Sequence, residues 1–465
     1  MECVRRALGL VCVLGAALTA GCADDPTTPT LEAQLITPEG ESPFALGSYD
    51  RLHILFDQEG SELVDYDLEL DEDDFRVPFP LDPDVRSRIR VALERGTETW
   101  VGAPPRFFPG DGYTEASWLV RIVMGRPGTC AVVTPYEEDV ARADVAHLRV
   151  GVYVFHFGGR TASGNSAAVT VSDHLWVTSG TSLVDLPEPA GRTKAAMAGT
   201  FSTTTSTLGV VLSDGGNWTY VLTAASLDAE RAQTLVLHEG AGPDSALMRR
   251  EAQGDVFVAG GVSGDMPVAG LSRVSGSGGV TTGNLMAPRS GATAVPMPAG
   301  ALVVGGDRRA GAPFGELVDL STFATAAVEA PAEAEEVRSE PVVVQGGESL
   351  WVLGGTDAEG AALETTWVVR GCPATCAVEA GPTLTLASAP TAEGDVVTAD
   401  GSVWRAVETG GWHLEPIADL VHPRVGAGLV PYESGGVWIQ GGTDPSGAPR
   451  RDAELCYPAE LSALD

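Results

Sequence analysis

The stretch LWVLGGTD, at residues 350–357, returns almost unchanged as VWIQGGTD at residues 437–444. Each copy is an apolar run with an aromatic side chain three positions before a glycine pair, and Thr-Asp follows the pair. A segment that occurs twice in this form indicates a repeated structural unit. More copies, at a near-constant spacing, are therefore expected elsewhere in the chain.

Glycine pairs follow an apolar run at three other places. The first glycines of the five pairs are Gly158, Gly260, Gly305, Gly354 and Gly441. Their separations are 102, 45, 49 and 87 residues, so each of the two long gaps leaves room for one degenerate copy. Weaker matches lie in those gaps, at 208–218 and 400–408. The sequence is therefore interpreted as seven copies at a period of about 47 residues.

An arginine stands at a near-constant distance before four of the pairs. The four are Arg142, Arg289, Arg338 and Arg424. The interval to the first glycine is the same for the first three arginines and one position longer for the fourth. Random glycine pairs would not keep this interval. The unit is therefore interpreted as an arginine, a strand, a tight turn, a strand that ends in the glycine pair, a polar loop and two more strands. Four antiparallel strands per repeat are typical of a propeller blade.

The unit resembles the kelch repeat, in which hydrophobic residues precede a glycine pair on the second strand of a blade. The resemblance extends over about residues 128–460. It implies an all-β fold with a kelch-type β-propeller at residues 126–465, with seven blades favoured and six possible. The glycines are expected to adopt positive φ angles where the backbone is crowded. The bulky residue three positions before each pair, such as Trp351 or Trp438, is expected to pack between blades.

The composition argues against one class of partner. The chain has 63 acidic and 29 basic residues, which give a formal charge of -34. Because such a charge repels phosphate backbones, no nucleic acid partner is expected. The 57 glycines and 31 prolines, with no long stretch of helical periodicity, favour an all-β protein.

The first residues resemble a bacterial lipoprotein signal. Arg5 and Arg6 precede an apolar stretch, and the sequence LTAGC ends at Cys22. The resemblance implies a signal peptide at 1–21, lipidation of Cys22 and a lipidated tether at 22–30. The protein would then be an outer membrane lipoprotein, facing the periplasm or the cell surface, whose membrane contact is its N-terminal lipid anchor. An ordinary signal peptide, cut at another small residue, is the alternative.

Residues 31–125 lack the repeat. Short apolar strands are expected at 51–56, 75–79, 88–93 and 118–124, separated by turn residues. This pattern favours a small β-sandwich, for which an immunoglobulin-like topology is one candidate. The acidic run at 65–74 lacks the glycine and the closing glutamate of a calcium loop, so a solvated strand and loop is favoured there. The domain is expected to act as a spacer between the anchor and the propeller.

Four cysteines remain beyond the signal and the anchor. An exported chain meets an oxidising compartment, where cysteine pairing is expected. The sequence TCAVV around Cys130 is similar to TCAVE around Cys376, while Cys372 and Cys456 both end a third strand. The repeat therefore pairs Cys372 with Cys376 and Cys456 with Cys130, so that an N-terminal strand completes the last blade. Free thiols and a metal site are the alternatives.

Some propeller enzymes resemble galactose oxidase, which holds copper with histidines and tyrosines and carries a cysteine–tyrosine thioether. This chain has an adjacent Cys456 and Tyr457, but its seven histidines are scattered singly. The sequence also lacks a Ser-His-Asp order or a nucleophile elbow in a fitting context. No catalytic residue, no metal site and no cofactor are therefore predicted. A galactose-oxidase-like or other propeller enzyme acting on carbohydrate is the alternative function.

A binding role is the favoured interpretation. In a four-stranded blade, the loops between strands two and three emerge on the same face as the segments that join the blades. That face is expected to carry the recurring arginines and five candidate ligand-binding residues: Arg160, Asp307, Arg308, Asp357 and Asp444. Mixed charges suit a polar ligand. The chain is thus expected to be a monomeric, non-catalytic recognition or scaffolding lipoprotein that binds an envelope protein or a glycan. For each residue alone, a structural pair with a carboxylate or carbonyl is the simpler interpretation.

Overall fold

The computed structural model describes residues 30–462 except for a set of short gaps. The gaps are 41, 59–63, 70–84, 105–116, 138–140, 144, 151–152, 158, 166–167, 174–177, 186–193, 203–206, 214–217, 225–228, 243, 251–253, 298–299, 309–311, 332–337, 347–348, 373–374, 382, 384–394, 399–400, 408–412 and 433–434. The predicted signal peptide, Cys22 and nearly all of the tether lie outside the described residues, as do Gly158 and the strand predicted at 75–79.

The described part of the chain is nearly all β-structure. Its helices are short 3-10 turns, η1 (Pro43–Leu46) and η4 (Ala459–Ser462). Within the described residues, no helix has the length and apolar character needed to cross a membrane. This agrees with the all-β composition of the sequence.

Two sheets form the N-terminal part, in which six strands are described. One is a parallel pair of β1 (Thr30–Ile36) and β6 (Ser117–Val123). The other has the order β3 (Val64–Glu69), β2 (Arg51–Gln58), β4 (Ser87–Arg95) and β5 (Glu98–Gly102), and all its pairs are antiparallel. The predicted strands at 51–56, 88–93 and 118–124 correspond to β2, β4 and β6.

The acidic run begins on the exposed face of the second sheet. Asp67 pairs with Arg51 and Asp65 pairs with His53, each across the β2–β3 ladder. Both contacts are diagonal, since Arg51 lies directly opposite Glu69 and His53 directly opposite Asp67, and diagonal neighbours are within reach of long side chains. The described part of the run, up to Glu69, is therefore a strand with cross-strand partners, as the solvated-strand interpretation predicts.

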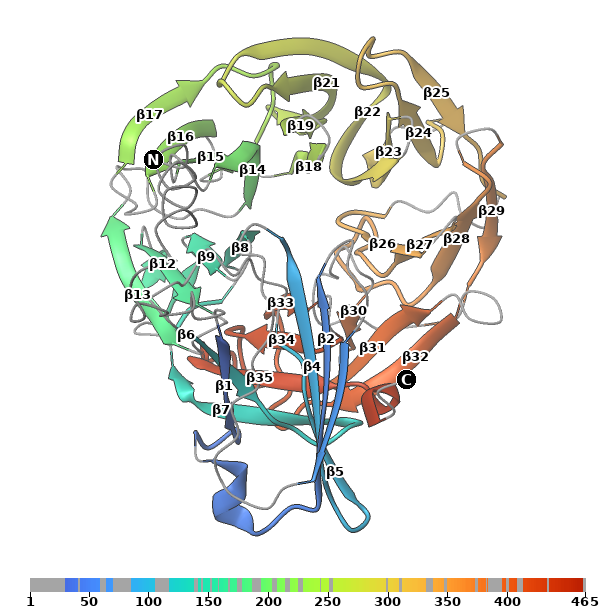
Figure 1. The fold of residues 1–465 in the computed structure, drawn as a ribbon. Helices are drawn as coiled ribbons and strands as arrows, with labels where there is room; N and C mark the ends of the chain where they lie inside the picture. The colour runs from blue at the N-terminus through green and yellow to red at the C-terminus, as the bar shows by residue number, and fades with distance from the viewer. Residues whose placement is uncertain are drawn as a thin grey trace, which may run out of the picture.

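The remaining strands form antiparallel sheets that follow one another around a ring (Figure 1). The first two sheets, from the inner strand outward, are β8 (Ala146–Val150), β9 (Tyr153–Phe157), β12 (Ala168–Asp173) and β13 (Thr178–Asp185), then β14 (Lys194–Ser202), β15 (Thr207–Ser213), β16 (Trp218–Ala224) and β17 (Ala229–Leu235). A two-stranded hairpin of β10 (Arg160–Thr161) and β11 (Gly164–Asn165) lies between β9 and β12 in the sequence. The degenerate copy predicted at 208–218 thus contains the second strand of a sheet.

A long strand connects the next two groups. β18 (Ala246–Arg250), β19 (Asp255–Ala259) and β21 (Met266–Val274) pair in order with the first half of β22 (Val280–Met297), and β20 (Val262–Ser263) pairs with β21. The second half of β22 pairs with β23 (Gly300–Arg308), which is followed by β24 (Gly315–Val318) and β25 (Thr325–Val328). β22 is therefore the last strand of one group and the first of the next.

Three sheets complete the ring. They are β26 (Val342–Gly346), β27 (Ser349–Leu353), β28 (Thr366–Arg370) and β29 (Ala377–Ala380); then β30 (Asp395–Val397), β31 (Ser402–Val407) and β32 (His413–Asp419); and finally β33 (Gly428–Pro431), β34 (Val437–Gln440), β35 (Asp452–Tyr457) and β7 (Thr129–Glu137). The degenerate copy at 400–408 contains β31, again a second strand. The architecture is thus propeller-like.

The glycine pairs lie where neighbouring sheets approach each other most closely. Gly260 and Gly261 have φ angles of 68° and 120°, which glycine adopts without strain. A Cβ atom on Gly260 would lie 2.4 Å from the carbonyl oxygen of Arg289, in the strand β22 that connects the two groups. In three of the pairs, the backbone amide of the second glycine donates to the carbonyl oxygen of one of the recurring arginines: Gly261 to Arg289 at 2.8 Å, Gly306 to Arg338 at 2.6 Å and Gly442 to Arg142 at 3.2 Å.

The bulky residues before the glycine pairs are buried, as expected. Trp438 is 1% exposed and shares a hydrophobic cluster with Val154, which lies in the first sheet of the ring. Trp351 is 3% exposed and packs with Val396 of the following sheet. These side chains therefore hold one sheet against its neighbour.

The ends of the ring meet in the last sheet. β7 pairs with β35 in antiparallel fashion, with Cys130 opposite Cys456. The sulfur atoms of Cys130 and Cys456 lie 1.99 Å apart, and those of Cys372 and Cys376 lie 1.97 Å apart. These two disulfide-bonded pairs are the ones that the repeat predicts. A strand from the start of the ring thus covers the edge of a sheet from its end.

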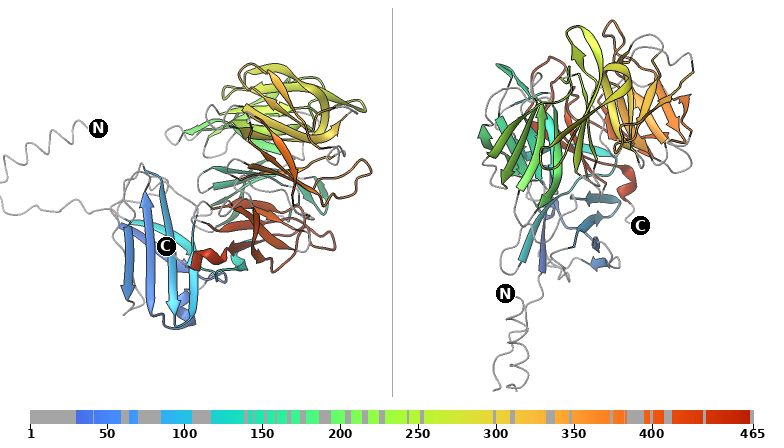
Figure 2. Two further views of the ribbon diagram at one scale, coloured as in Figure 1. Left: turned by 90° about the vertical axis from the view of Figure 1, so that its right-hand side faces the viewer. Right: turned by 90° about the horizontal axis from the view of Figure 1, so that it is seen from above.

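The N-terminal sheets lie against one side of the ring, next to the last sheet (Figure 2). One hydrophobic cluster contains Val101 and Val123 from the N-terminal sheets together with Leu455 and Tyr457 of β35. The hydroxyl of Tyr457 donates to the carbonyl oxygen of Val123 at 2.7 Å and accepts from the amide of Ala103 at 3.3 Å. Because Tyr457 is 1% exposed, this contact belongs to a buried core shared by the two parts.

Candidate functional site: the loop face

The face of the ring formed by the loops between second and third strands, and by the segments joining successive sheets, is named the loop face. The recurring arginines were expected on this face, with a structural pair to a carboxylate or carbonyl as the simpler interpretation of each one. All four are buried, with exposed fractions of 0% for Arg142 and Arg289 and 2% for Arg338 and Arg424. A buried guanidinium is not available to a partner, so the structural interpretation applies.

Arg289 explains the near-constant interval between the arginine and the glycine pair. Its Nη1 donates to the carbonyl oxygen of Gly305, the first glycine of the next pair, at 2.8 Å. Its Nη2 donates to the carbonyl oxygen of Pro313 at 2.6 Å, and its Nε donates to Glu316 at 3.1 Å. The arginine therefore ties together the joining segment, the second strand and the loop after it. Burial lowers the pKa of Arg289, while the charge of Glu316 opposes that shift.

Glu316 completes the arrangement from the third strand. Both residues of the Arg289–Glu316 ion pair have fully buried side chains. The Glu316 carboxylate also accepts the backbone amides of Met286 and Ala287, at 2.5 and 3.1 Å. A buried charge is stable only when it is paired and hydrogen-bonded, and here both conditions hold.

The last sheet repeats this arrangement. The Nη2 of Arg424 donates to Glu454 at 2.5 Å, and its Nη1 donates to the carbonyl oxygen of Gly441 at 3.3 Å. The Glu454 carboxylate accepts the amides of Val421 and His422, at 2.7 and 3.0 Å. Glu316 and Glu454 therefore each accept the two backbone amides that lie three and two positions before the arginine with which the glutamate is paired.

Two other sheets use neutral partners. Arg338 donates to the carbonyl oxygens of Gly354 and Thr365, at 2.5 and 2.8 Å, and to the hydroxyl of Thr365. No arginine stands at the corresponding interval before the glycine pair at Gly260. The carbonyl oxygen of Gly260 instead accepts from Ser245 Oγ and lies near a ring nitrogen of His238, each at 2.8 Å. Burial lowers the pKa of His238, so this contact is made by a neutral ring at neutral pH.

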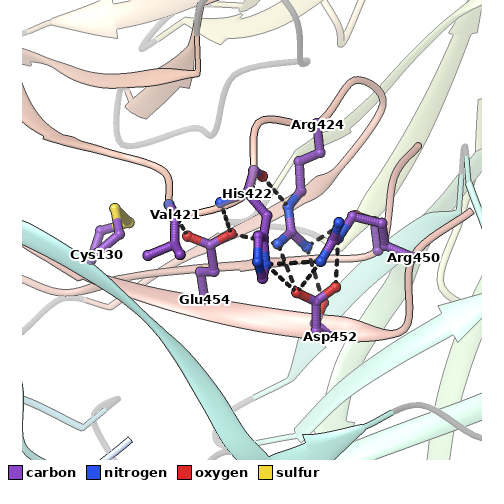
Figure 3. Close-up of polar contacts among 9 residues, drawn as sticks. Cys130, Val421, His422, Arg424, Arg450, Asp452 and Glu454 are labelled. Carbon is purple, nitrogen blue, oxygen red and sulfur yellow. Dashed lines mark hydrogen bonds and ion pairs between the residues drawn. A yellow bond between two sulfur atoms is a disulfide. The ribbon is translucent and has the colours of Figure 1, made fainter. Parts of the chain in front are cut away.

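A denser cluster lies at the start of β35 (Figure 3). Asp452 accepts from Arg450 Nε at 2.7 Å and Nη2 at 2.8 Å, and from Arg424 Nη2 at 3.2 Å. His422 Nδ1 lies 3.0 Å from Asp452 Oδ2 and 2.8 Å from Arg450 Nη2. Burial alone would raise the pKa of Asp452, but the hydrogen bond from Arg450 and the charge of Arg424 outweigh it and hold this pKa well below its usual range.

This cluster has the residue types of a metal site. Ligand atoms of His422, Asp452 and Glu454 lie within 4.8 Å of one another. The carboxylates, however, already accept from Arg424 and Arg450. A cation bound there would have to displace two guanidinium groups, so the arrangement fits an ion-pair network better than a metal centre.

Two candidate ligand-binding residues shape their own loops. Asp357 Oδ1 accepts the amides of Glu359 and Ala361, at 3.0 and 2.7 Å. Asp444 Oδ1 accepts the amides of Ser446 and Ala448, at 2.8 and 3.0 Å. The repeated Thr-Asp thus forms the same turn twice, in which the aspartate replaces backbone partners.

The other three candidates lie at the ends of second strands or just after them. Arg160 and Asp307 are exposed. Arg308 pairs through its backbone with Arg289 in the β22–β23 ladder. The structure therefore brings the five candidates to one face but spreads them around the ring, with only Asp307 and Arg308 on the same strand, β23.

The adjacent Cys456 and Tyr457 of the enzyme alternative both have structural contacts. Cys456 is fully buried and bonded to Cys130, and the Tyr457 hydroxyl is committed to Ala103 and Val123. Burial strongly raises the pKa of Tyr457, which opposes the phenolate form.

Several residues that organise this face were missed from the sequence. Glu316 lies closer to Gly305 in the sequence than Glu454 lies to Gly441, so a difference in loop length hides the equivalence of the two glutamates. A glutamate that follows a small residue and precedes leucine in both third strands was the available signal.

Comparisons with known proteins leave the function open. No family model matches the chain, and no curated protein matches it. Among solved structures, 281 chains match. One of them, titled "Structure of YjhT", is 11% identical, and the match covers 68% of this chain and 95% of that chain with a TM-score of 0.39.

Proposed function

We propose that the chain is a seven-bladed kelch-type β-propeller, with an N-terminal β-sandwich, that serves as an envelope-anchored recognition or scaffolding protein without catalytic activity. The repeat count of the sequence, the ring of sheets and the pairing of β7 with β35 support the propeller. The partner is an envelope protein or a glycan bound at the loop face.

The observation that carries the proposal is the rigid support of the loops. Buried ion pairs such as Arg289–Glu316 and Arg424–Glu454 hold the joining segments, and Asp357 holds a loop between strands two and three. A surface whose backbone is fixed before binding loses less entropy when a partner docks. In this proposal the charged residues of the repeat support the surface and neighbouring side chains contact the partner.

The anchor is part of the same proposal. Lipidation of Cys22 would hold the protein at the outer membrane, and the sandwich would hold the ring at a fixed orientation because Tyr457 joins the two parts within a buried core. Labelling with a fatty-acid analogue should mark the natural chain and not the Cys22→Ser variant, which should also leave the membrane fraction. Equal labelling of both would refute lipidation at Cys22.

Site-specific photo-crosslinking tests recognition by the loop face. A photoreactive residue is placed at Asp265 or at Pro445, both exposed on the loop face, and in a control at Ser277, exposed on the β21–β22 turn of the opposite face. Cells carrying the full chain are irradiated, and the products are identified by mass spectrometry. Specific products from Asp265 or Pro445 are expected. Products from Ser277 alone, or from none of the three sites, would refute the proposal.

A further inference from the structure

Large hydrophobic side chains that are exposed gather on the loop face. Among the described residues they are Leu46, Val236, Met266, Met286, Val421 and Val425. Only Leu46 belongs to the N-terminal part, and the other five lie in joining segments or at a turn between second and third strands. Single exposed apolar residues need no explanation, but their concentration on one face does.

Three of these residues lie on loops that are bonded edge to edge. The amide of Val262 donates to the carbonyl oxygen of Gly240 at 2.9 Å, which joins 260–268 to 236–245. The amide of Gly291 donates to the carbonyl oxygen of Asp244 at 2.6 Å, which joins 286–291 to the same segment. Val236, Met266 and Met286, with exposed fractions of 84%, 49% and 56%, are therefore carried by three adjoining segments.

The same three segments carry exposed carboxylates. Glu239, Asp244 and Asp265 are exposed, and Glu239 accepts a hydrogen bond from Ser263 Oγ at 3.0 Å. The basic residue described in these segments is Arg289, which is fully buried and paired with a glutamate. The described part of this surface thus presents negative charge without an exposed arginine or lysine. We name it the methionine arc, and define it as Val236, Glu239, Asp244, Asp265, Met266 and Met286.

We propose that the methionine arc binds a partner segment in which lysine or arginine alternates with apolar residues. This inference rests on the proposed recognition role and names the chemistry of the partner. Methionine side chains are flexible and polarisable, so they adapt to apolar groups of varied shape. The surrounding carboxylates attract cationic side chains and repel an acidic segment, which gives selectivity. Because the carboxylates are exposed, salt weakens their part of the binding.

Binding of short synthetic peptides by the full chain tests this inference. The probe is a fluorescein-labelled peptide of alternating lysine and leucine, with lysine–serine and glutamate–leucine peptides as comparisons, measured by fluorescence anisotropy. The first peptide should bind at least tenfold more tightly than either of the others. A lysine–serine peptide that binds equally well would refute a role for the methionines.

Matched variants separate the arc from the overall charge. Met266→Ser/Met286→Ser and Glu239→Gln/Asp265→Asn should each weaken binding about tenfold. The controls are Leu46→Ser, an exposed apolar residue outside the arc, and Glu39→Gln/Glu460→Gln, which removes two exposed carboxylates elsewhere. The controls should change binding less than twofold. Equal losses in the carboxylate control and the arc variant would show attraction to the net charge of -34 and refute the inference.

Failure of the methionine arc proposal can be distinguished from failure of the proposed recognition function. If photo-crosslinks form from Pro445 while arc variants leave peptide binding unchanged, the loop face recognises a partner but the methionine arc does not. If the peptide binds the arc and no partner is crosslinked from either loop-face site, the recognition proposal fails. Circular dichroism of each variant confirms that the fold is retained.

Discussion

Replacing Glu316 by glutamine should be among the most damaging conservative changes in the ring. The variant keeps the side-chain volume but leaves the Arg289 guanidinium without its charged partner, at a position where both side chains are fully buried. The backbone amides of Met286 and Ala287 bind different oxygens of the carboxylate, and glutamine has an acceptor oxygen at only one of these two positions.

The magnitude follows from these contacts. Leaving one buried charge unpaired costs about 3–5 kcal/mol. Each buried amide that loses its acceptor adds about 1–3 kcal/mol, although the contributions are not additive. We expect Glu316→Gln to lower the free energy of unfolding by about 4 kcal/mol. Arg289→Met/Glu316→Gln should cost at least about 1 kcal/mol less than the sum of the two single changes, because it removes both charges together.

Urea unfolding at neutral pH, followed by tryptophan fluorescence with the disulfides intact, measures these values. Thr365→Val is the matched control, because Arg338 keeps two carbonyl partners when it loses this hydroxyl. That change should cost at most about 2 kcal/mol. The reasoning would be refuted by a Glu316→Gln cost below about 1 kcal/mol, or by single changes that add without coupling.

Three further predictions concern other contacts. Gly260→Ala should destabilise the protein by several kcal/mol more than Gly264→Ala. Both glycines have positive φ, but of these two only Gly260 has a backbone oxygen 2.4 Å from the added Cβ. Equal urea midpoints of the two variants would contradict this steric argument. Asp452→Asn should lower stability at pH 7. The pKa of Asp452 is lower in the folded protein than in the unfolded chain, so its carboxylate stabilises the fold fully above the unfolded pKa of about 3.9 and less as the pH falls below it. In urea titrations, the difference in free energy of unfolding between the variant and the natural chain should therefore shrink toward about pH 2.5. Tyr457→Phe should cost about 1–3 kcal/mol and increase hydrogen exchange in the N-terminal sheets first; unchanged exchange there would show that the hydroxyl does not join the two parts.

The repeat could be predicted because its constraints are local in sequence. A glycine pair needs positive φ angles and space, so Gly260 and Gly261 are recognisable from their neighbours alone. The interval between Arg289 and Gly305 is nearly constant because one guanidinium reaches one carbonyl across a single hairpin. The cysteine pairs followed from the same alignment of repeats.

The sequence favours a structural pair for each arginine, but the partner could not be predicted because it depends on packing. For Arg289, only the structure identifies the buried carboxylate as that of Glu316. The contact between Tyr457 and the N-terminal sheets could not be predicted for a similar reason, since its hydrogen-bond partners, Ala103 and Val123, are far away in the sequence. Exposure of Met286 likewise depends on its place between two sheets.

The pairing of β7 with β35 sets the order in which the protein can mature. The two strands lie at opposite ends of the segment that forms the ring, and their paired cysteines, Cys130 and Cys456, have a sequence separation of 326. An early strand must therefore wait, with an open edge, until β35 has been made. Chaperones have that interval in which to shield it, and a truncated product would be recognisable to proteases by the strand left without a neighbour.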